Sequence, residues 1–578
     1  PAPAPAPAGP AANARWFAYG AGMDTAFGGV EGAVRVGVGF IPNFKVAFTD
    51  LPVDAAGGDT KEPNTAVASI RRARDDQVFG AIWEVPEEAG EPDGSGATPL
   101  MRMAPIIVKS ELPKIELQGS ALRRLHSCFA VVRTVVIAKG STKGAPCLTY
   151  TASSGTRNDS DALPSREYRL RLCAAAFRLA LPGLYRASLE SFPSRELKVK
   201  IDQVLEDETG AKSGKSREEI NYVRVSLASA CDSAAARALE VVRPDPLYLD
   251  PLACIAAGPP AIQRAIKTLP MSDGPRGREY HMRIRYVDDF VRSSIGILED
   301  GKNDHGNGEG QDHIKQLVVL GAGFDATAVR LGPHLRKLGV KVFELDLKPI
   351  ILIKKLFLLD VLSDMELGHI TYVPADLRSG DWIQELKRHG LNPLQRTAWI
   401  CQSLFPYLSE ETVKNILQGI HTFSSGSNAL VLATVVRKNN LNMNHGGNVA
   451  RIKIEALRNR MQGKSGLTEG KRDADGEQLQ TALESLLEEE SEKGNLETPQ
   501  KFWECANTVP YFKSLSWKVV HQGTQQNCRY PDGIYGYFGS SAQGTDNNKR
   551  KDYSHLSSSL PPKIPPKTFC VVLSNCEE

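Results

Sequence analysis

Residues 317–325 read Leu-Val-Val-Leu-Gly-Ala-Gly-Phe-Asp, a short apolar run that ends in two closely spaced glycines. Such a run predicts a buried parallel strand and then a tight turn, where the backbone can approach a nucleotide-like ligand closely. A second short run, Val342-Phe-Glu-Leu-Asp346, follows about one βαβ crossover later. Asp346 comes 23 residues after Gly323, near the spacing at which a strand-end carboxylate binds a ribose diol. The chain is therefore predicted to bind a cofactor that contains adenosine.

The glycines alone leave the kind of cofactor open. Gly321-Ala-Gly-Phe-Asp-Ala326 also fits the looser dinucleotide fingerprint, which makes a dinucleotide-dependent oxidoreductase one alternative. The motifs after the second strand argue against that alternative. They are Pro374-Ala-Asp-Leu-Arg378 and Gln402-Ser-Leu-Phe-Pro-Tyr-Leu408.

Six motifs in a fixed order resemble the leucine carboxyl methyltransferase family, a branch of the class I S-adenosylmethionine (SAM) methyltransferases. Besides the four motifs above they include Asp245-Pro-Leu-Tyr-Leu-Asp-Pro-Leu-Ala253 and Met282-Arg-Ile-Arg-Tyr-Val-Asp-Asp289. The resemblance covers about residues 245–437, with weaker matches near 502–538. It implies an α/β Rossmann-like domain with a seven-stranded sheet that binds SAM.

The resemblance also implies roles for individual residues. Arg283 would hold the SAM carboxylate, which suits a bidentate guanidinium. Gly321 and Gly323, with Ala322 between them, would form the floor under the methionine part. Asp346 would bind the ribose hydroxyls.

Three further residues complete the implied cofactor site. Asp376 and Leu377 would face the adenine, one accepting from its amino group and the other packing on the ring. Gln402 stands where the family usually has Glu, so hydrogen bonding is kept but a negative charge beside the sulfonium is lost. If the methyl acceptor is a carboxylate, no general base is needed, because that nucleophile is already ionised. The acceptor, a carboxylate or a hydroxyl, is not identified by the sequence.

The amino-terminal region has a different pattern. Aromatic and β-branched runs predict strands within 15–23, 46–48, 77–85 and 129–137, and Pro164-Ser-Arg-Glu-Tyr168 predicts a helix start. This order resembles the γ-glutamylcyclotransferase family, whose fold is a small α+β barrel with flanking helices. The resemblance covers about residues 16–193. The motifs that carry it are Tyr19-Gly20, Val78-Phe-Gly-Ala-Ile-Trp83, Pro164–Tyr168 and Gly183-Leu-Tyr185.

That family uses a glutamate, in a Leu-x-x-x-Glu-Gly-like segment, as general acid and base during γ-glutamyl cyclisation. Here Leu122-Arg-Arg-Leu-His126-Ser127 resembles that segment, with His126 in place of Glu. Ala21-Gly22 also replace the Ser-Asn pair that the family prefers after Tyr19. Histidine can transfer protons, so His126 is the one catalytic candidate, with a partly buried structural histidine as the alternative. We therefore expect a degenerate domain without cyclotransferase activity that is used for recognition.

The predicted organisation has five parts. They are a Pro/Ala-rich leader (1–14), the cyclotransferase-like domain (15–195), a linker or connecting helix (196–217), the methyltransferase-like domain (218–540) with a charged insertion (451–499), and a Pro/Ser-rich tail (541–578). A final strand is predicted at 568–573, antiparallel to a strand at 516–520.

Composition limits the partners and the compartment. The net charge of +3 on 578 residues is too mild to predict direct binding of nucleic acid. No run of eighteen apolar residues occurs, so no membrane span is expected. Ten cysteines without a C-x-x-C pair indicate an intracellular, reducing compartment, either the cytoplasm or an organellar matrix after presequence removal. The histidine- and acid-rich stretch 299–313 is interpreted as a solvated loop, and no metal site is predicted.

Two functions from different classes stay open. The first is a SAM-dependent methyltransferase with a cyclotransferase-like domain for recognition. The second is a catalytically inactive structural or assembly subunit of a large complex, with protein partners, built from two enzyme-derived domains. His126 and Gln402 favour the second function, whereas Arg283, Asp346 and Asp376 favour the first.

Overall fold

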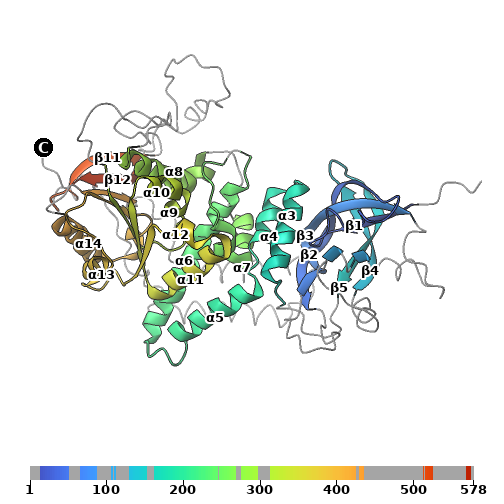
Figure 1. Ribbon diagram of the computed structural model, residues 1–578, viewed down its shortest axis with the longest axis horizontal. Coiled ribbons are helices and arrows are strands. Elements are labelled where there is room, and N and C mark those ends of the chain that lie inside the picture. Colours follow the sequence, from blue (N-terminus) through green and yellow to red (C-terminus); the bar gives the residue numbers. More distant parts are fainter. Residues whose placement is uncertain are drawn as a thin grey trace, which may run out of the picture. The chain divides into compact units, whose positions relative to one another are not determined.

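The computed structural model describes residues 13–50, 66–86, 106–107, 110–111, 129–152, 162–244, 246–268, 275–296, 313–424, 429–434, 512, 515–524 and 568–574. The charged insertion, most of the leader and the tail, and all but one residue of the stretch 299–313 lie outside these ranges. Figure 1 shows the elements along the chain.

The first unit contains a closed barrel with the strand order β1-β3-β2-β4-β5. Its strands are β1 (Asn13–Ala18), β2 (Val34–Asp50), β3 (Ala66–Pro86), β4 (Phe129–Ala138) and β5 (Gly144–Ala152). Parallel pairing of Phe17 in β1 with Thr149 in β5 closes the barrel, and the other neighbouring strands are antiparallel. The predicted barrel is confirmed, although β2 and β3 extend well beyond the runs that predicted them.

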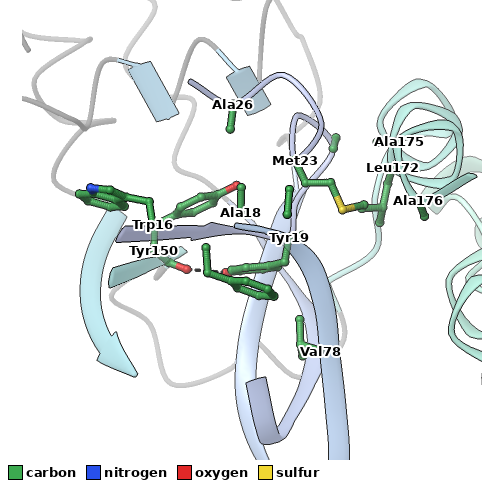
Figure 2. Packing of buried hydrophobic residues seen from close by; sticks show 14 of the residues in the cluster. Trp16, Ala18, Tyr19, Met23, Ala26, Val78, Tyr150, Leu172, Ala175 and Ala176 are labelled. Carbon is green, nitrogen blue, oxygen red and sulfur yellow. Dashed lines mark hydrogen bonds between the residues drawn. The ribbon is translucent and has the colours of Figure 1, made fainter. Parts of the chain in front are cut away.

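Aromatic side chains fill the interior of the barrel. Figure 2 shows Tyr19 beside Tyr150, and their rings stack with centroids 5.2 Å apart. The Tyr19 hydroxyl donates a hydrogen bond of 2.7 Å to the Tyr150 carbonyl oxygen. Helix α3 (Arg166–Arg178) adds Leu172 to this core and begins at Ser165, whose side chain accepts from the Tyr168 N–H. The predicted helix start is therefore confirmed.

Further helices follow in the first unit. They are α4 (Gly183–Glu190), α5 (Arg195–Thr209), α6 (Arg217–Val241) and α7 (Ala253–Thr268). The charged stretch 196–217 is thus largely a connecting helix, which was one of its two interpretations. A capping box of Ser216 and Glu219 starts α6.

The chain divides into two compact units at a different place from the predicted linker. They are Pro1–Met271 with Leu352–Leu362, and Ser272–Ile351 with Ser363–Glu578. Helices α6 and α7 therefore lie in the same compact unit as the barrel, whereas the second domain was predicted to start at residue 218. Close packing explains the difference, because a Cβ at Gly183 in α4 would lie 2.7 Å from the Val242 carbonyl oxygen after α6.

The second unit is built on a seven-stranded sheet with the order β11-β12-β10-β9-β6-β7-β8. Its strands are β6 (Gln316–Leu320), β7 (Lys341–Asp346), β8 (Ile370–Pro374), β9 (Thr397–Cys401), β10 (Ala429–Thr434), β11 (Lys518–Thr524) and β12 (Thr568–Ser574). Strands β6 to β10 pair in parallel, and β12 is antiparallel to both neighbours, which confirms the predicted last strand. The strand order reverses at β6, and such a switch point is where open α/β sheets bind ligands.

Alternating side chains of β6 point to two different cores. Leu317 and Val319 pack with residues of α8 (Pro275–Ser294), α9 (Thr327–Arg330) and α10 (Gly332–Lys337). Val318 and Leu320 pack on the other face with residues of α13 (Trp382–Arg388) and α14 (Glu410–Phe423). Because both faces are covered, only the strand ends of the central sheet remain for a ligand. The other elements are α11 (Lys348–Val361), α12 (Asp364–Leu367) and the 3-10 helix η2 (Phe405–Tyr407).

A search of the described helices finds none that combines the length and the apolar character needed to cross a membrane.

Candidate functional site

The glycine turn after β6 has a backbone that other residues rarely adopt. Gly321 has φ +63° and Gly323 has φ +45°, both in the left-handed region that favours glycine. A Cβ at Gly321 would also lie 2.7 Å from Cδ1 of Leu404, in the segment after β9. Conformation therefore favours glycine at position 321, and a Cβ there would also displace the Leu404 side chain, which lies against the turn.

The carboxylate of Asp346 holds this turn against the end of β7. Its Oδ2 accepts a hydrogen bond of 2.7 Å from the Gly323 N–H, and its Oδ1 accepts one of 2.7 Å from the Leu347 N–H. The Ala322 N–H also donates to the Leu345 carbonyl oxygen at 3.0 Å. The structure thus brings the predicted glycines and acid together.

The end of β8 lies beside the end of β7, where the Ala375 N–H donates to the Asp346 carbonyl oxygen at 2.9 Å. The next residue, Asp376, accepts from the Arg378 backbone N–H at 2.9 Å and from its guanidinium at 2.6 Å. Partial burial acts to raise the pKa of Asp376, but the bonds from Arg378 outweigh it and lower the pKa. Asp376 is therefore an ionised acceptor, and Leu377 after it is buried. The pairing with Arg378 was not anticipated from the sequence.

The end of β9 contributes Gln402. Its Oε1 is buried and accepts no hydrogen bond from any residue in the described part of the chain. The next residue, Ser403, has φ +53°, a left-handed conformation that is strained for a residue with a side chain. Buried polar atoms without partners and strained backbone are both enriched at ligand sites.

Arg283 lies on α8 and is partly buried. Val287 and Phe290 follow it by four and seven residues, so the three share one helix face. Val287 and Phe290 pack in the same core as Ala322 of the glycine turn. The helix is also fixed near the turn by a nearly buried ion pair, in which Arg330 of α9 lies 2.8 Å from Asp288. Arg283 therefore lies one turn before Val287 on a helix face whose apolar residues share a core with Ala322.

Taken together, the strand ends of β9, β6, β7 and β8 form one continuous edge. It offers the carboxylates of Asp346 and Asp376, a glycine turn and the neutral amide of Gln402. In the described ranges, no three His, Cys, Asp or Glu side chains are grouped as a metal site would need.

A second polar cluster lies in the barrel around Glu111, which sequence analysis did not single out. Glu111 is fully buried. Its carboxyl accepts hydrogen bonds from the Tyr150 hydroxyl at 2.6 Å, the Tyr168 hydroxyl at 2.5 Å and the Ala21 N–H at 2.9 Å. Gly20 lies so close that a Cβ there would come within 2.1 Å of Glu111 Oε1.

Electrostatics make this carboxyl a candidate proton donor and acceptor. Burial raises the pKa of Glu111, and the hydrogen bonds from Tyr150, Tyr168 and Ala21, together with Arg171, offset only part of that rise. The Arg171 guanidinium fixes the backbone beside it by donating to the Glu111 carbonyl oxygen at 2.8 Å. A buried carboxyl with a raised pKa beside a small-residue loop is typical of acid–base sites.

The structure thus places a carboxyl group, that of Glu111, beside the loop after Tyr19. His126 and its segment 122–127 lie outside the described residues, so the role predicted for His126 stays a prediction. Glu111 was not predicted as a site residue, because Ser110-Glu111-Leu112 does not fit the Leu-x-x-x-Glu-Gly-like pattern. The available signal was indirect, since Gly20 and Tyr168, which contact Glu111, both belong to motifs that were recognised.

Comparisons with known proteins bear mainly on the second unit. Residues 230–421 match the model of the leucine carboxyl methyltransferase family. A putative S-adenosyl-L-methionine-dependent methyltransferase of Mycolicibacterium smegmatis is 32% identical over 194 residues, which cover 33% of this chain and 58% of that protein. A protein of Frankia alni with the same description is 32% identical over 210 residues, covering 36% of this chain and 69% of that protein. The match thus spans less than two thirds of the first relative.

Among solved structures, a gamma-glutamyl cyclotransferase is similar at 19% identity and a TM-score of 0.22, covering 37% of this chain and 99% of that chain.

Proposed function

Because the chain belongs to the leucine carboxyl methyltransferase family, we propose that it is a SAM-dependent methyltransferase that acts on a carboxylate or hydroxyl acceptor. The observation that carries the proposal is the carboxylate of Asp346. It accepts from the Gly323 N–H and so fixes the glycine turn at the switch point of the sheet. The structure thus supports a position for Asp346 at which a strand-end carboxylate binds a ribose diol in nucleotide-binding folds.

Each residue at the edge has a role in holding SAM. Asp346 would accept from the ribose hydroxyls, as an acid at this spacing does in nucleotide-binding folds. Asp376 and Leu377 would then face the adenine on the β8 side. Gly321 and Gly323 would let the methionine part lie close to the backbone, and Arg283 would pair with its carboxylate.

Methyl transfer requires the protein mainly to position the methyl donor and the acceptor. Bound SAM supplies a methyl group on a positively charged sulfur. The protein must hold the acceptor in line with that group and keep water out. A carboxylate acceptor needs no base, whereas a hydroxyl acceptor would need one, and no residue of the site is assigned that role.

Calorimetric titration of the full chain with SAM and with S-adenosylhomocysteine (SAH) tests the proposal. We expect both to bind, and Asp346→Asn to weaken both at least about tenfold, since a hydrogen bond to a charged group contributes about 1.5–3 kcal/mol. The matched control is Asp381→Asn, at an exposed position before α13. This variant should bind SAM and SAH as the wild type does.

A folded wild-type chain that binds neither compound would refute the proposal. The alternative, a structural or assembly subunit with protein partners, would then be favoured.

The Glu111 cluster favours a second candidate function, a γ-glutamyl cyclotransferase reaction in the barrel. In that reaction the α-amine of a γ-glutamyl group attacks its own γ-carbonyl carbon, and the bond from that carbon to the leaving amine breaks. Glu111 would take the proton from the attacking amine and return it to the leaving amine, so that 5-oxoproline and a free amine result. The buried carboxyl beside Ala21 supports this role, whereas a degenerate domain used for recognition is the alternative.

Release of 5-oxoproline from γ-glutamylalanine measures this second function. Glu111→Gln should lower kcat by about a hundredfold or more, which is the usual contribution of a general acid–base group. Glu84→Gln, in an exposed ion pair on β3, is the control and should leave kcat unchanged. A wild-type chain without activity would leave the barrel as a recognition module.

A further inference from the structure

A row of basic residues lies where the parallel strands of the second unit begin, at the edge of the sheet opposite the candidate cofactor site. Lys315 and Arg396 come directly before β6 and β9, and Lys341 is the first residue of β7. The Lys315 N–H donates to the Arg396 carbonyl oxygen at 2.9 Å, and the Lys341 N–H donates to the Lys315 carbonyl oxygen at 3.1 Å. Neighbouring strands lie about 4.8 Å apart, so the three backbone positions lie within about 10 Å of one another.

The end of helix α10 adds Arg336 and Lys337 to this row, because both are in its last turn and β7 follows directly. Basic residues at the end of a helix stabilise its dipole, which gives these two a structural role. That explanation does not apply to Lys315 and Lys341, which are on no helix. Both lysine side chains are exposed, and neither forms an ion pair with any residue in the described part of the chain. We call these four residues and Arg396 the basic edge.

The acidic side chains near the basic edge bind neighbours of their own. Glu366, whose carbonyl oxygen accepts from Arg336 at 2.7 Å, has a carboxylate that accepts from the Ser363 N–H at 2.9 Å. Glu385 forms an ion pair with Arg388 in the last turn of α13. The positive charges of the two exposed lysines are therefore available to a partner.

Exposed aliphatic side chains accompany the basic edge. Leu394, two residues before Arg396, is 76% exposed, and Leu338, three residues before β7, is 38% exposed. Strongly exposed aromatic rings, on which nucleic-acid bases would stack, are found elsewhere in the described ranges. They are Phe177, which belongs to the first unit, and Tyr407, which follows β9 at the opposite edge of the sheet. Apolar side chains among charged ones are typical of surfaces that bind proteins.

We propose that the basic edge, together with Leu338 and Leu394, is a docking surface for a protein partner that presents acidic and apolar side chains on one segment. Carboxylates of the partner would pair with Lys315 and Lys341, and its apolar side chains would cover the two leucines. Strand β6 has five residues, so this surface lies about 16 Å from the glycine turn. A partner bound there would leave the cofactor edge open, and the inference does not depend on methyl transfer.

Binding of a labelled synthetic peptide to the full chain, measured by fluorescence anisotropy, tests the inference. The probe is a helical peptide of about 20 residues, long enough to form a helix, with leucines on one face and glutamates on the other. We expect the wild type to bind it with a Kd below about 100 µM. Lys315→Glu combined with Lys341→Glu should weaken binding at least about tenfold, because two attractions become repulsions.

The matched control is Lys212→Glu combined with Lys414→Glu, which changes the net charge equally at exposed positions of the α5–α6 turn and of α14. This control should bind the peptide as the wild type does. Leu394→Ser should weaken binding at least about threefold, because apolar burial is lost. Leu249→Ser, at a leucine that is 67% exposed, should have no effect.

A folded wild type that does not bind the peptide would overturn the inference, and so would equal weakening by the two double variants. Binding of single-stranded RNA or of phosphatidylserine vesicles in place of the peptide would also overturn it, in favour of a nucleic acid or a membrane. If the glutamate variant at Lys315 and Lys341 does not fold, Lys315→Gln with Lys341→Gln provides the same comparison and should still weaken binding.

Discussion

At the scale of single residues, two acids in opposite surroundings define the two candidate sites. Asp376 stands at a strand end where Arg378 lowers its pKa and keeps it ionised. Glu111 lies in the barrel, where burial raises the pKa of its carboxyl. An ionised acceptor suits recognition of donors on a ligand, whereas a carboxyl that is readily protonated suits proton transfer. Glycines flank both sites, and Gly20 and Gly321 each leave no room for a Cβ.

The effect of the Leu404 contact at Gly321 can be measured by comparison with Gly339, a second glycine with a left-handed backbone. Gly339 has φ +65° but no atom within 4 Å of the place a Cβ would take, whereas at Gly321 Leu404 is 2.7 Å away. Gly339→Ala should therefore cost about 1–2 kcal/mol of unfolding free energy from backbone strain alone. Gly321→Ala should cost more, because Leu404 must also move. Equal losses in denaturant unfolding would show that the contact with Leu404 is unimportant.

The buried carboxyl predicts a definite pH dependence. The pKa of Glu111 is higher in the folded protein than in the unfolded chain, so folding favours its protonated form. Its contribution to stability is present below the unfolded value of about 4.3 and is lost as the pH rises through the folded value. Glu111→Gln, which stays neutral, should thus become more stable than the wild type as the pH rises toward 7.

Thermal midpoints of the wild type and Glu111→Gln measured across this pH range provide the test. Glu84→Gln should follow the wild type. A wild type that gains stability over Glu111→Gln with rising pH would contradict the assignment.

At the scale of secondary-structure elements, the start of α3 contacts both Glu111 and the end of α11. The first turn of α3 holds Tyr168, which donates to Glu111. The next residue, Arg169, forms a buried ion pair with Asp360 near the end of α11. Arg166 donates to the Asp360 carbonyl oxygen at 2.8 Å and so satisfies a backbone group that the helix end would leave without a partner. The start of α3 therefore contributes Tyr168 to the Glu111 cluster and also binds the end of α11 through Arg166 and Arg169.

Breaking the pair on α3 should have a large effect. Asp360→Ala leaves Arg169 buried without its partner, and such a change typically costs about 3–5 kcal/mol. The exposed pair of Lys198 and Asp202 on α5 is the control, since Asp202→Ala should cost less than about 1 kcal/mol. Denaturant unfolding compares the two losses. A small loss for Asp360→Ala would mean that water reaches Arg169.

At the scale of the whole molecule, each of the two compact units has its own candidate site. The first has the closed barrel with Glu111, and the second has the switch-point edge with Asp346. Each site is made of residues from one unit, so a substitution in one site leaves the residues of the other site in place. This separation lets the two proposed activities be tested in the same full-length chain.

Ligand-induced stabilisation follows from the methyltransferase site. SAM at one hundred times its Kd should add about 2.7 kcal/mol to the stability of the unit that binds it. Calorimetric scans with and without SAM should show this gain in the wild type and in Glu111→Gln. Asp346→Asn, if it weakens SAM about tenfold, should keep only about 1.4 kcal/mol of this gain at the same SAM concentration. An equal gain in stability in all three proteins would show that SAM binds at a site that does not include Asp346.

Sequence alone determined the features that local patterns encode. The apolar run 317–320 predicted the buried strand β6, and the glycines that follow it predicted a tight turn, whose left-handed conformation at Gly321 and Gly323 the structure shows. The acid at 346 was predicted to lie at that turn, and it accepts from Gly323. The family resemblance then supplied the order of the strand ends.

Only the tertiary structure decided the rest, because those features depend on residues that no local pattern links. Glu111 meets Tyr150, Tyr168 and Ala21 across sequence separations of 39, 57 and 90 residues. Its raised pKa is a consequence of burial, which sequence spacing does not encode. The family resemblance singled out Gln402, but only packing shows that its side-chain oxygen is buried without a partner among the described residues. Helices α6 and α7 join the barrel unit through packing as close as that of Gly183 against Val242.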